Sequence, residues 1–289
     1  MSEATSAKTS ANTYDEIVYE VDGPVAVITF NRPDKLNAFT GHMQEEIRHA
    51  IGQAESNEDV VGIVITGAGR GFCSGMDMNA LGDMTESGER GGGQGDPALK
   101  TDLGADLGDN FHLGFTFLMT VRKPIIAAVN GPCAGLGMSF ALMCDLRFAA
   151  QSTKFITSFS QRGLVAEHGQ CWILPRIVGP SRALDLFFTS RRLGPEEALQ
   201  MGLVNRVCED DGLVDDAKAY VRELAEMASP TSLMYMKQQV YRHLNMTLKE
   251  SMEETEVLMD ASLKREDFKE GVASFVERRP PKFKRITNN

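Results

Sequence analysis

The sequence predicts a mixed α/β protein that ends in a mostly helical region. Over about the first 160 residues, short apolar runs bounded by turn residues alternate with amphipathic segments, a pattern typical of strands joined by helices. After about Gly163 strand-like runs cease and apolar residues recur at helical spacing. We therefore expect a disordered tail over 1–13, a core over 14–205 and a helical C-terminal region over 206–289.

Composition limits the partners. A chain of 289 residues can bury a substantial core, and a net charge of −10 argues against nucleic acid as a partner. The sequence contains no run of 18 apolar residues, so it predicts no membrane-spanning helix. Its first residues lack the pattern of a signal peptide. The five cysteines follow no metal-binding spacing. We expect a cytoplasmic protein with reduced thiols, without a metal and away from the membrane.

In the first half, a hairpin, a helix and several buried strands are expected. The runs 14–21 and 24–30 flank Asp22-Gly23, a hairpin signal. Thr40 can cap a helix that runs to about Ser56. The remaining elements predicted here are strands at 60–66, 125–129, 146–150 and 154–156, a mobile loop at 82–108, and helices at 110–121 and 136–143.

The second half predicts one helix after another. Apolar residues at helical spacing, with Gly, Pro, Ser and Thr between the segments, set the expected bounds. These helices are expected at 169–178, 181–189, 195–201, 213–228, 231–244, 247–263 and 266–277.

The stretch 130–145 predicts a site for negative charge. A buried strand ends at an Asn-Gly turn, and Gly135 and Gly137 then open a short apolar helix. The free N–H groups of a helix start stabilise a bound phosphate or an oxyanion formed during a reaction. A dinucleotide fingerprint, a P-loop, a nucleophile elbow and a metal cluster are each excluded by a missing residue. The residues alone leave phosphate and oxyanion both open.

In five motifs the chain resembles the crotonase (enoyl-CoA hydratase/isomerase) superfamily. They are NRPDKLNAF at 31–39, VITGAGRGFCSGMDM at 64–78, KPIIAAVNGPCAGLGMSFALMCDLRFAA at 123–150, LPRIVGPSRALDLFFTSRRLGPEEALQMGLVNRV at 174–207, and EGVASFVERRPPKFK at 270–284. The resemblance implies a spiral of β-β-α units and a C-terminal helical region that builds trimers, often paired into hexamers. It also implies an acyl-CoA thioester as substrate, so that coenzyme A enters with the substrate and no other cofactor is needed.

The resemblance also implies an oxyanion hole made of two backbone N–H groups. Matching the motifs places one donor on Ser74, just before Gly75, and the other on Leu136. Removing a proton beside a thioester makes an enolate, and two fixed N–H groups in a dry pocket stabilise it by several kcal/mol.

Contacts to coenzyme A and to the acyl chain are implied for a further group of residues. Lys35 is expected near the nucleotide phosphates, while Phe275 and Arg278 match an aromatic and a basic residue that often serve a neighbouring subunit. Ordinary surface charge is the alternative for the basic tail. The other residues expected to bind or line the substrate site are Cys73, Met76, Gly135, Ser139 and Phe159.

The acidic residues of a hydratase are missing at two positions. Family hydratases carry two glutamates where this chain has Ser139 and Phe159. Hydration requires a group that deprotonates water and a group that protonates C2, and neither side chain can do this at neutral pH. Ordinary hydratase activity is therefore not expected.

Glu167 is the expected catalytic base. It matches the acidic position of the Δ3,Δ2-enoyl-CoA isomerases, and one carboxylate can move a proton from C2 to C4. Phe159 would exclude water and favour internal proton return. The sequence thus favours an enoyl-CoA isomerase of fatty-acid β-oxidation. The alternatives are a hydratase with an unusual acid/base set, an acyl-CoA-binding protein without turnover and, for Glu167 itself, a carboxylate that only stabilises a helix start.

Overall fold

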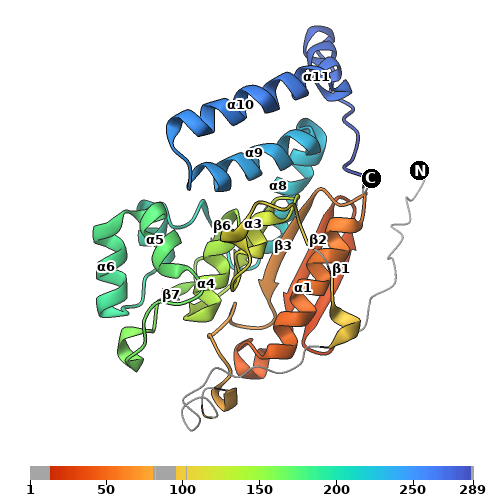
Figure 1. Cartoon of the computed structure of the whole chain (residues 1–289). Helices are drawn as coiled ribbons and strands as arrows, with labels where there is room; N and C mark the ends of the chain where they lie inside the picture. The colour runs from red at the N-terminus through yellow and green to blue at the C-terminus, as the bar shows by residue number, and fades with distance from the viewer. Residues whose placement is uncertain (1–13, 81, 83–95, 102, 288–289) are drawn as a thin grey trace, which may run out of the picture.

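The computed structural model describes residues 14–80, 82, 96–101 and 103–287. The tail expected over 1–13, and residues 83–95 and 102 of the expected loop, lie outside the described residues. Figure 1 shows the sheet and its covering helices in the lower part of the molecule, with α9, α10 and α11 above them. Among the described residues, no helix is both long and apolar enough to cross a membrane.

The main sheet orders its six strands β1-β2-β3-β4-β6-β8. The β1–β2 pair is the expected antiparallel hairpin, and every later neighbour is parallel. Parallel neighbours need crossover connections, which here are mostly helices. The strands are β1 Ile17–Asp22, β2 Val25–Phe30, β3 Gly62–Gly67, β4 Ile125–Val129, β6 Leu146–Ala150 and β8 Arg206–Cys208.

Both faces of this sheet are covered. Because side chains alternate along a strand, Ile63 and Ile65 of β3 pack in the core cluster that contains α1 (Gly41–Ser56). Val64 belongs to the opposite cluster, which contains α8 (Leu213–Met227). Burial on both faces explains why these strands are continuously apolar in sequence.

A second, two-stranded sheet carries the end of the glycine-rich stretch. Its strands β5 (Pro132–Ala134) and β7 (Lys154–Ile156) pair in parallel, and α4 (Leu136–Met143) follows β5 directly. In chain order, β1-β2-α1 and β4-β5-α4 are both β-β-α units, as expected for the crotonase fold. The sequence did not predict β5, which lies inside the glycine-rich stretch, or β8, which lies among the helices of the second half.

The helices of the second half confirm the predicted bounds to within one residue at each end. They are α5 Gln170–Val178, α6 Pro180–Thr189, α7 Pro195–Gln200, α8 as above, α9 Pro230–His243, α10 Leu248–Leu263 and α11 Glu266–Glu277. Their starts are well marked: Thr247, for example, forms a capping box with Glu250.

The helix predicted at 110–121 is wrong. The chain instead forms a 3-10 turn at Asp109–Phe111 and the short α3 at Phe117–Thr120. Gly114 separates them with a φ of +60°, and a Cβ there would lie 2.9 Å from Nδ1 of His168. A distant contact therefore interrupts an apolar pattern that looked helical.

Asp145, which follows α4, connects the C-terminal helices to the core. Its carboxylate accepts hydrogen bonds from the backbone N–H of Ile125 at 2.7 Å and from the hydroxyl of Tyr241 at 2.9 Å. It also forms a 2.8 Å ion pair with Lys237. Because Tyr241 and Lys237 both lie on α9, this one carboxylate joins α9 to β4 and to the end of α4.

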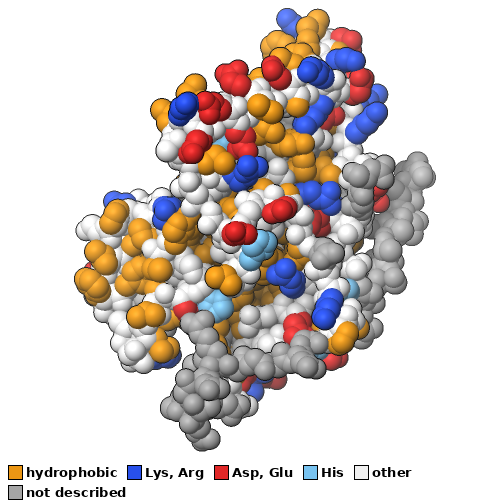
Figure 2. All heavy atoms as spheres, in the orientation of Figure 1, with side chains coloured by type: hydrophobic (Ala, Val, Ile, Leu, Met, Phe, Trp, Pro, Cys, Tyr) orange, Lys and Arg blue, Asp and Glu red, His pale blue; other side chains and the backbone are white. Residues whose placement is uncertain are grey.

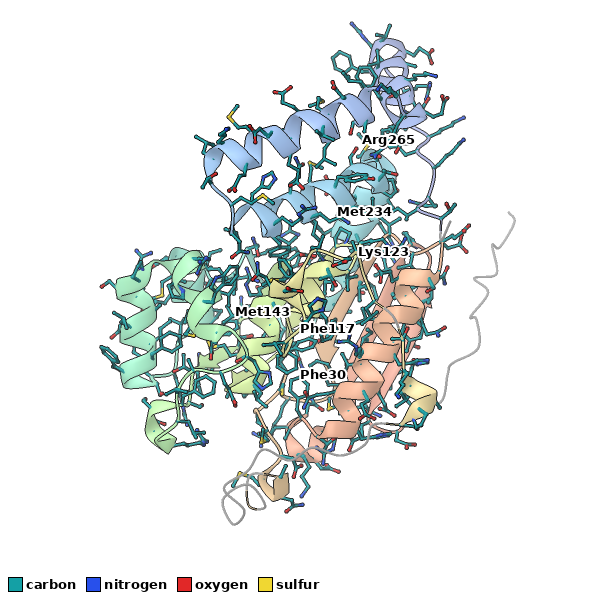
Figure 3. All side chains as sticks on the ribbon, in the orientation of Figure 1. Phe30, Phe117, Lys123, Met143, Met234 and Arg265 are labelled. Carbon is teal, nitrogen blue, oxygen red and sulfur yellow. The ribbon has the colours of Figure 1, made fainter. Side chains whose placement is uncertain are left out.

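Lys123 is a buried cation at the end of α1 (Figure 3). Its Nζ donates to the carbonyl oxygen of Ala54, in the last turn of α1, at 2.9 Å and to that of Asn57, which follows the helix, at 2.5 Å. These carbonyls have no partner within the helix. Burial disfavours the charged form and lowers the pKa of Lys123 to about 8.

We predict that Lys123 makes stability rise with pH. The folded protein releases this proton near pH 8, whereas the unfolded chain keeps it up to the usual pKa of 10.5. Between these values the unfolded chain binds more protons, so the free energy of unfolding increases with pH by roughly 3 kcal/mol in total. Urea unfolding at pH 7, 8.5 and 10 should show this rise in the wild type relative to Lys123→Met.

Subtracting the free energy of unfolding of Lys123→Met from that of the wild type removes the contribution of every group that titrates in both proteins, including the buried cysteines. Lys249→Met is the matched control, since Lys249 is 83% exposed on α10. Its pH dependence should equal that of the wild type. Equal slopes for wild type and Lys123→Met would contradict the prediction.

Candidate active site

The site forms where three segments of chain run side by side. Residues 72–77 lie in the middle, hydrogen-bonded on one side to 36–39 and on the other to 132–134. On the first side, Phe39 N–H donates to Gly75 O at 2.8 Å. On the second, Ala134 N–H donates to Cys73 O at 2.9 Å. The two glycine-rich strand ends predicted from sequence therefore meet.

Two glycines allow this close approach. A Cβ on Gly137 would lie 2.4 Å from the carbonyl oxygen of Cys73, a distance that no side chain can adopt. Gly75 has a φ of +112°, and a Cβ there would lie 3.3 Å from the carbonyl oxygen of Ala134 and 3.8 Å from the backbone nitrogen of Leu136. The backbone at Gly75 thus faces the start of α4.

The donor assigned to Ser74 is not available. Its backbone N–H donates to the carbonyl of Leu36 at 3.0 Å, and its hydroxyl donates to the carbonyl of Lys35 at 3.3 Å. Both groups hold the 72–77 segment against the preceding loop. The prediction of Ser74 as an oxyanion donor is therefore wrong for this structure.

Met76 offers a donor in its place. It pairs with Phe39 in an isolated parallel bridge, in which Gly75 O and Asp77 N–H bond to Phe39. In an extended chain, the N–H of Met76 then points the opposite way, toward the side where 134–136 lie. It bonds no acceptor among the described residues. Sequence reasoning missed this donor because a motif does not show to which side an N–H points.

Leu136 is the residue expected to supply the second N–H group. It is the first residue of α4, so its N–H has no carbonyl acceptor within the helix. Gly135 precedes it with a φ of +51° and holds its place by donating to Ile156 O at 3.0 Å. All residues of α4 are buried, so little water reaches this end of the site. The positive charge of the helix N-terminus is therefore less screened.

The two hydratase positions are both buried. Ser139 follows Leu136 by one turn of α4, and its hydroxyl lies 3.3 Å from Gly135 O and 3.4 Å from Oε1 of Gln170. Phe159 is 6% exposed. Serine and phenylalanine therefore stand where two carboxylates would give a hydratase its acid and base.

Glu167 lies on a turn that is fixed to α4 from two sides. Its carbonyl accepts the N–H of Gln170 at 3.1 Å, and Gln170 contacts Ser139. The ring of His168 stacks on Phe115 at 4.7 Å. Phe115 in turn meets Phe140 of α4 at 5.2 Å between ring centroids. These contacts fix the backbone of this turn against α4, and the Glu167 side chain is 20% exposed.

An apolar wall surrounds this arrangement. Phe30, Phe39, Phe115 and Phe140 pack edge to face or tilted, at centroid distances of 5.2 to 5.8 Å. Such packing excludes water from the helix end. His168 joins this cluster through Phe115, and its Nε2 also lies 4.0 Å from Oε2 of Glu167.

Comparison with known proteins shows to which family the chain belongs. The family model described as enoyl-CoA hydratase/isomerase matches residues 20–286. The chain belongs to this family. It is 33% identical over 268 residues to the 1,2-epoxyphenylacetyl-CoA isomerase of Escherichia coli K12, covering 92% of this chain and 97% of that protein. With the short-chain-enoyl-CoA hydratase of Clostridium acetobutylicum it shares 30% over 266 residues, covering 92% and 96%.

Solved structures agree on the crotonase fold. The crystal structure of an enoyl-CoA hydratase/isomerase from Mycobacterium paratuberculosis superposes with a TM-score of 0.78 at 31% identity. That match covers 94% of this chain and 99% of the other. The protein is thus a crotonase-family enzyme, and its relatives include both hydratases and an isomerase.

The residues expected to contact coenzyme A fall into two groups. Lys35 is exposed beside the 72–77 segment, where Ser74 bonds its carbonyl. Phe275 and Arg278 lie on and after α11, both exposed, in the upper part of Figure 1. The structure therefore places Lys35 by the crotonase site and does not bring Phe275 or Arg278 to it within one chain.

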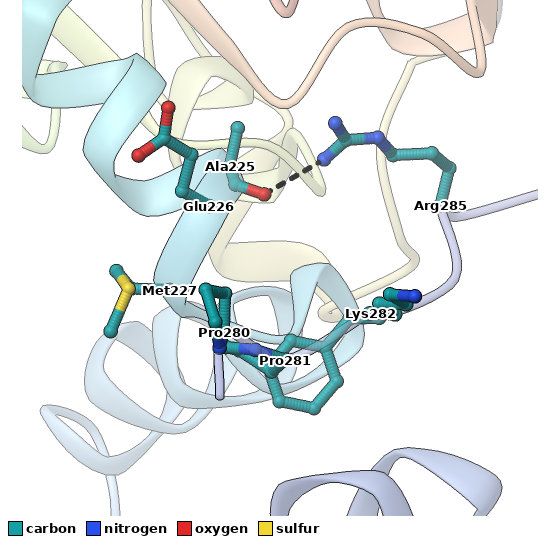
Figure 4. Close-up of a pocket in the computed structure, with 8 residues that line it drawn as sticks. Ala225, Glu226, Met227, Pro280, Pro281, Lys282 and Arg285 are labelled. Carbon is teal, nitrogen blue, oxygen red and sulfur yellow. Dashed lines mark hydrogen bonds between the residues drawn. The ribbon is translucent and has the colours of Figure 1, made fainter. Parts of the chain in front are cut away.

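Cys73 and the basic tail both contact other parts of the same chain. Burial raises the pKa of the Cys73 thiol to about 12, and the side chain packs under Gly137. The tail folds back on α8, where residues around Pro280 and Lys282 line a hollow and Arg285 donates to Ala225 O at 3.5 Å (Figure 4). Intrachain contacts thus account for part of the tail.

We predict that Gly137→Ala displaces α4. The new methyl group collides with the backbone of Cys73, so the free energy of unfolding should fall by about 1–3 kcal/mol and acyl-CoA binding should weaken. Urea unfolding and calorimetric titration with an acyl-CoA measure the two effects. Gly41→Ala is the control, because nothing lies within 4 Å of its Cβ position. Wild-type behaviour of Gly137→Ala would refute the close approach.

Proposed function

We propose that this enzyme moves the double bond of an enoyl-CoA between the 3,4 and 2,3 positions. The observation that supports this most is the turn carrying Glu167, which is fixed to the same helix that presents the Leu136 N–H. A 1,3-proton shift requires one carboxylate that carries the proton and one oxyanion hole that stabilises the enolate.

In the proposed mechanism, the thioester oxygen accepts hydrogen bonds from Met76 N–H and Leu136 N–H. The Glu167 carboxylate removes a proton from C2 of the 3-enoyl chain, and the electrons of the C–H bond pass into a dienolate. The protonated Glu167 then returns the proton to C4, which leaves the double bond between C2 and C3. Losing one such oxyanion donor costs about 3–4 kcal/mol in comparable sites.

Burial at the two hydratase positions favours internal proton return. Phe159 brings no hydrogen-bonding group, and Ser139 is enclosed between Gly135 and Gln170. With no carboxylate at either position, water that reached C3 would lack a second acid/base group there. The reaction needs no cofactor beyond the coenzyme A of the substrate, and we place it in fatty-acid breakdown in the cytoplasm.

A hydratase is the second candidate. Relatives of similar identity are named enoyl-CoA hydratases, and the Ser139–Gln170 pair is a buried polar group beside the proposed acyl site. In that case Glu167 would act as the base for water. Isomerisation involves no exchange of oxygen with the solvent, whereas hydration adds one solvent oxygen, so the two reactions are separable by product mass.

We predict that Glu167→Gln lowers isomerase turnover by about 10²–10⁴-fold while acyl-CoA binding remains. The amide keeps the shape of the carboxylate but cannot accept the proton. Mass-resolved products from 3-enoyl-CoA and 2-enoyl-CoA, offered separately in ¹⁸O-water, report the activity. Glu223→Gln, on the exposed side of α8, is the control and should retain wild-type turnover. Undiminished turnover in Glu167→Gln would eliminate this residue as the base.

We propose further that the C-terminal helices join copies of the chain into a trimer, or into a hexamer of paired trimers. Large apolar side chains stay exposed on these helices, and Figure 2 shows hydrophobic patches among charged residues there. Exposed apolar surface of this extent indicates an interaction surface. Its exposed members include Met236, Val240, Leu248, Met252, Val257, Val272 and Phe275.

Light scattering is predicted to give a mass of about 95 kDa, or twice that for a hexamer, from a chain of 31.7 kDa. Lysine at both Val240 and Val257 should lower this mass, because it places charges in a buried apolar interface. Val18→Lys, on the edge strand β1, leaves the expected interface untouched. A wild-type mass of about 32 kDa would contradict the assembly.

A further inference from the structure

Gln170 is a buried side chain whose amide has one atom that no described residue binds. It is 0% exposed at the first residue of α5, and its Oε1 lies 3.4 Å from the hydroxyl oxygen of Ser139. Its Nε2 is also buried and forms no hydrogen bond with any described residue. A buried amide with an unused donor is unfavourable unless another group binds to it.

Turning the amide around does not remove the problem. The Ser139 hydroxyl has one hydrogen, yet two acceptors lie near it, Gly135 O at 3.3 Å and Gln170 Oε1 at 3.4 Å. If the amide is rotated by half a turn, Nε2 donates to Ser139 and Ser139 donates to Gly135. Oε1 then takes the position without a partner. In either orientation one atom of the amide remains unsatisfied.

We propose that Gln170 binds one O–H group, either a water molecule or a hydroxyl on the acyl chain. An O–H group can both donate and accept, so it satisfies the amide in either orientation. Ser139 follows Leu136 by one helical turn and therefore lies on the same face of α4. The O–H group then sits beside the acyl chain as the chain leaves the oxyanion hole. This inference rests on the proposed acyl-CoA site.

Gln170 is thus a positioning residue that acts through the O–H group it holds. If the O–H group belongs to the acyl chain, the enzyme prefers hydroxylated acyl-CoA. If it is water, Gln170 and Ser139 hold that water in place and acyl-CoAs with or without a hydroxyl bind alike.

Binding measured in the Glu167→Gln background separates the two sources. Hexanoyl-CoA and 3-hydroxyhexanoyl-CoA are titrated calorimetrically, and high-resolution crystal structures are solved with and without them. A hydroxyl in the site predicts about fivefold tighter binding of the hydroxy compound, a preference that Gln170→Met abolishes. Water predicts equal affinities and an ordered oxygen within about 3.2 Å of the Gln170 amide, lost in Gln170→Met.

Equal affinities together with no such oxygen would overturn the proposal, because Gln170 would then bond the protein alone. Gln239→Met is the matched control, since Gln239 bonds only Thr255 at 3.3 Å on the distant α9–α10 pair. Ser139→Ala provides a second variant if Gln170→Met does not fold. Failure of the isomerase proposal does not affect this test, which measures binding and structure rather than turnover.

Discussion

The contact on which the site depends is the one between Gly137 and the carbonyl of Cys73. It brings two glycine-rich strand ends, more than fifty residues apart in sequence, close enough for their backbones to share hydrogen bonds. In the proposed mechanism, this close approach lets Met76 N–H and Leu136 N–H bond the same oxygen. The buried strands below and the aromatic rings beside it hold the backbone still, so the donors need no rearrangement when charge develops.

Much of the fold follows from local sequence, whereas the fine geometry of the site does not. The helices after Gly163 were predictable because capping residues and apolar spacing are local signals, as at Thr247. The interruption at Gly114 was not, because its cause is His168, a residue distant in the chain. Leu136 is a predicted donor because it matches the family motif, and the structure places it at a helix start. Met76 could not be predicted in this way, because the direction of its N–H is set by the bridge to Phe39.

By resemblance, Ser139 and Phe159 stand where family hydratases carry two glutamates. The structure shows how these two side chains are accommodated. Phe159 becomes part of the packed interior, while Ser139 forms a polar pair with Gln170. The role of Gln170 was not predictable, because a glutamine at the start of a helix usually faces solvent. The proposed acid/base chemistry rests on Glu167.

The carboxylate of Asp145 links the C-terminal helices to the position of α4. It stands at the opposite end of α4 from the oxyanion donors and is held there by Tyr241 and Lys237 of α9. The oxyanion helix is therefore anchored at one end by the glycine contact and at the other by the helices expected to join subunits. In the proposed trimer, the energy that copies of the chain gain by associating is coupled to the position of the Leu136 N–H, and substrate binding in return influences how tightly the copies associate.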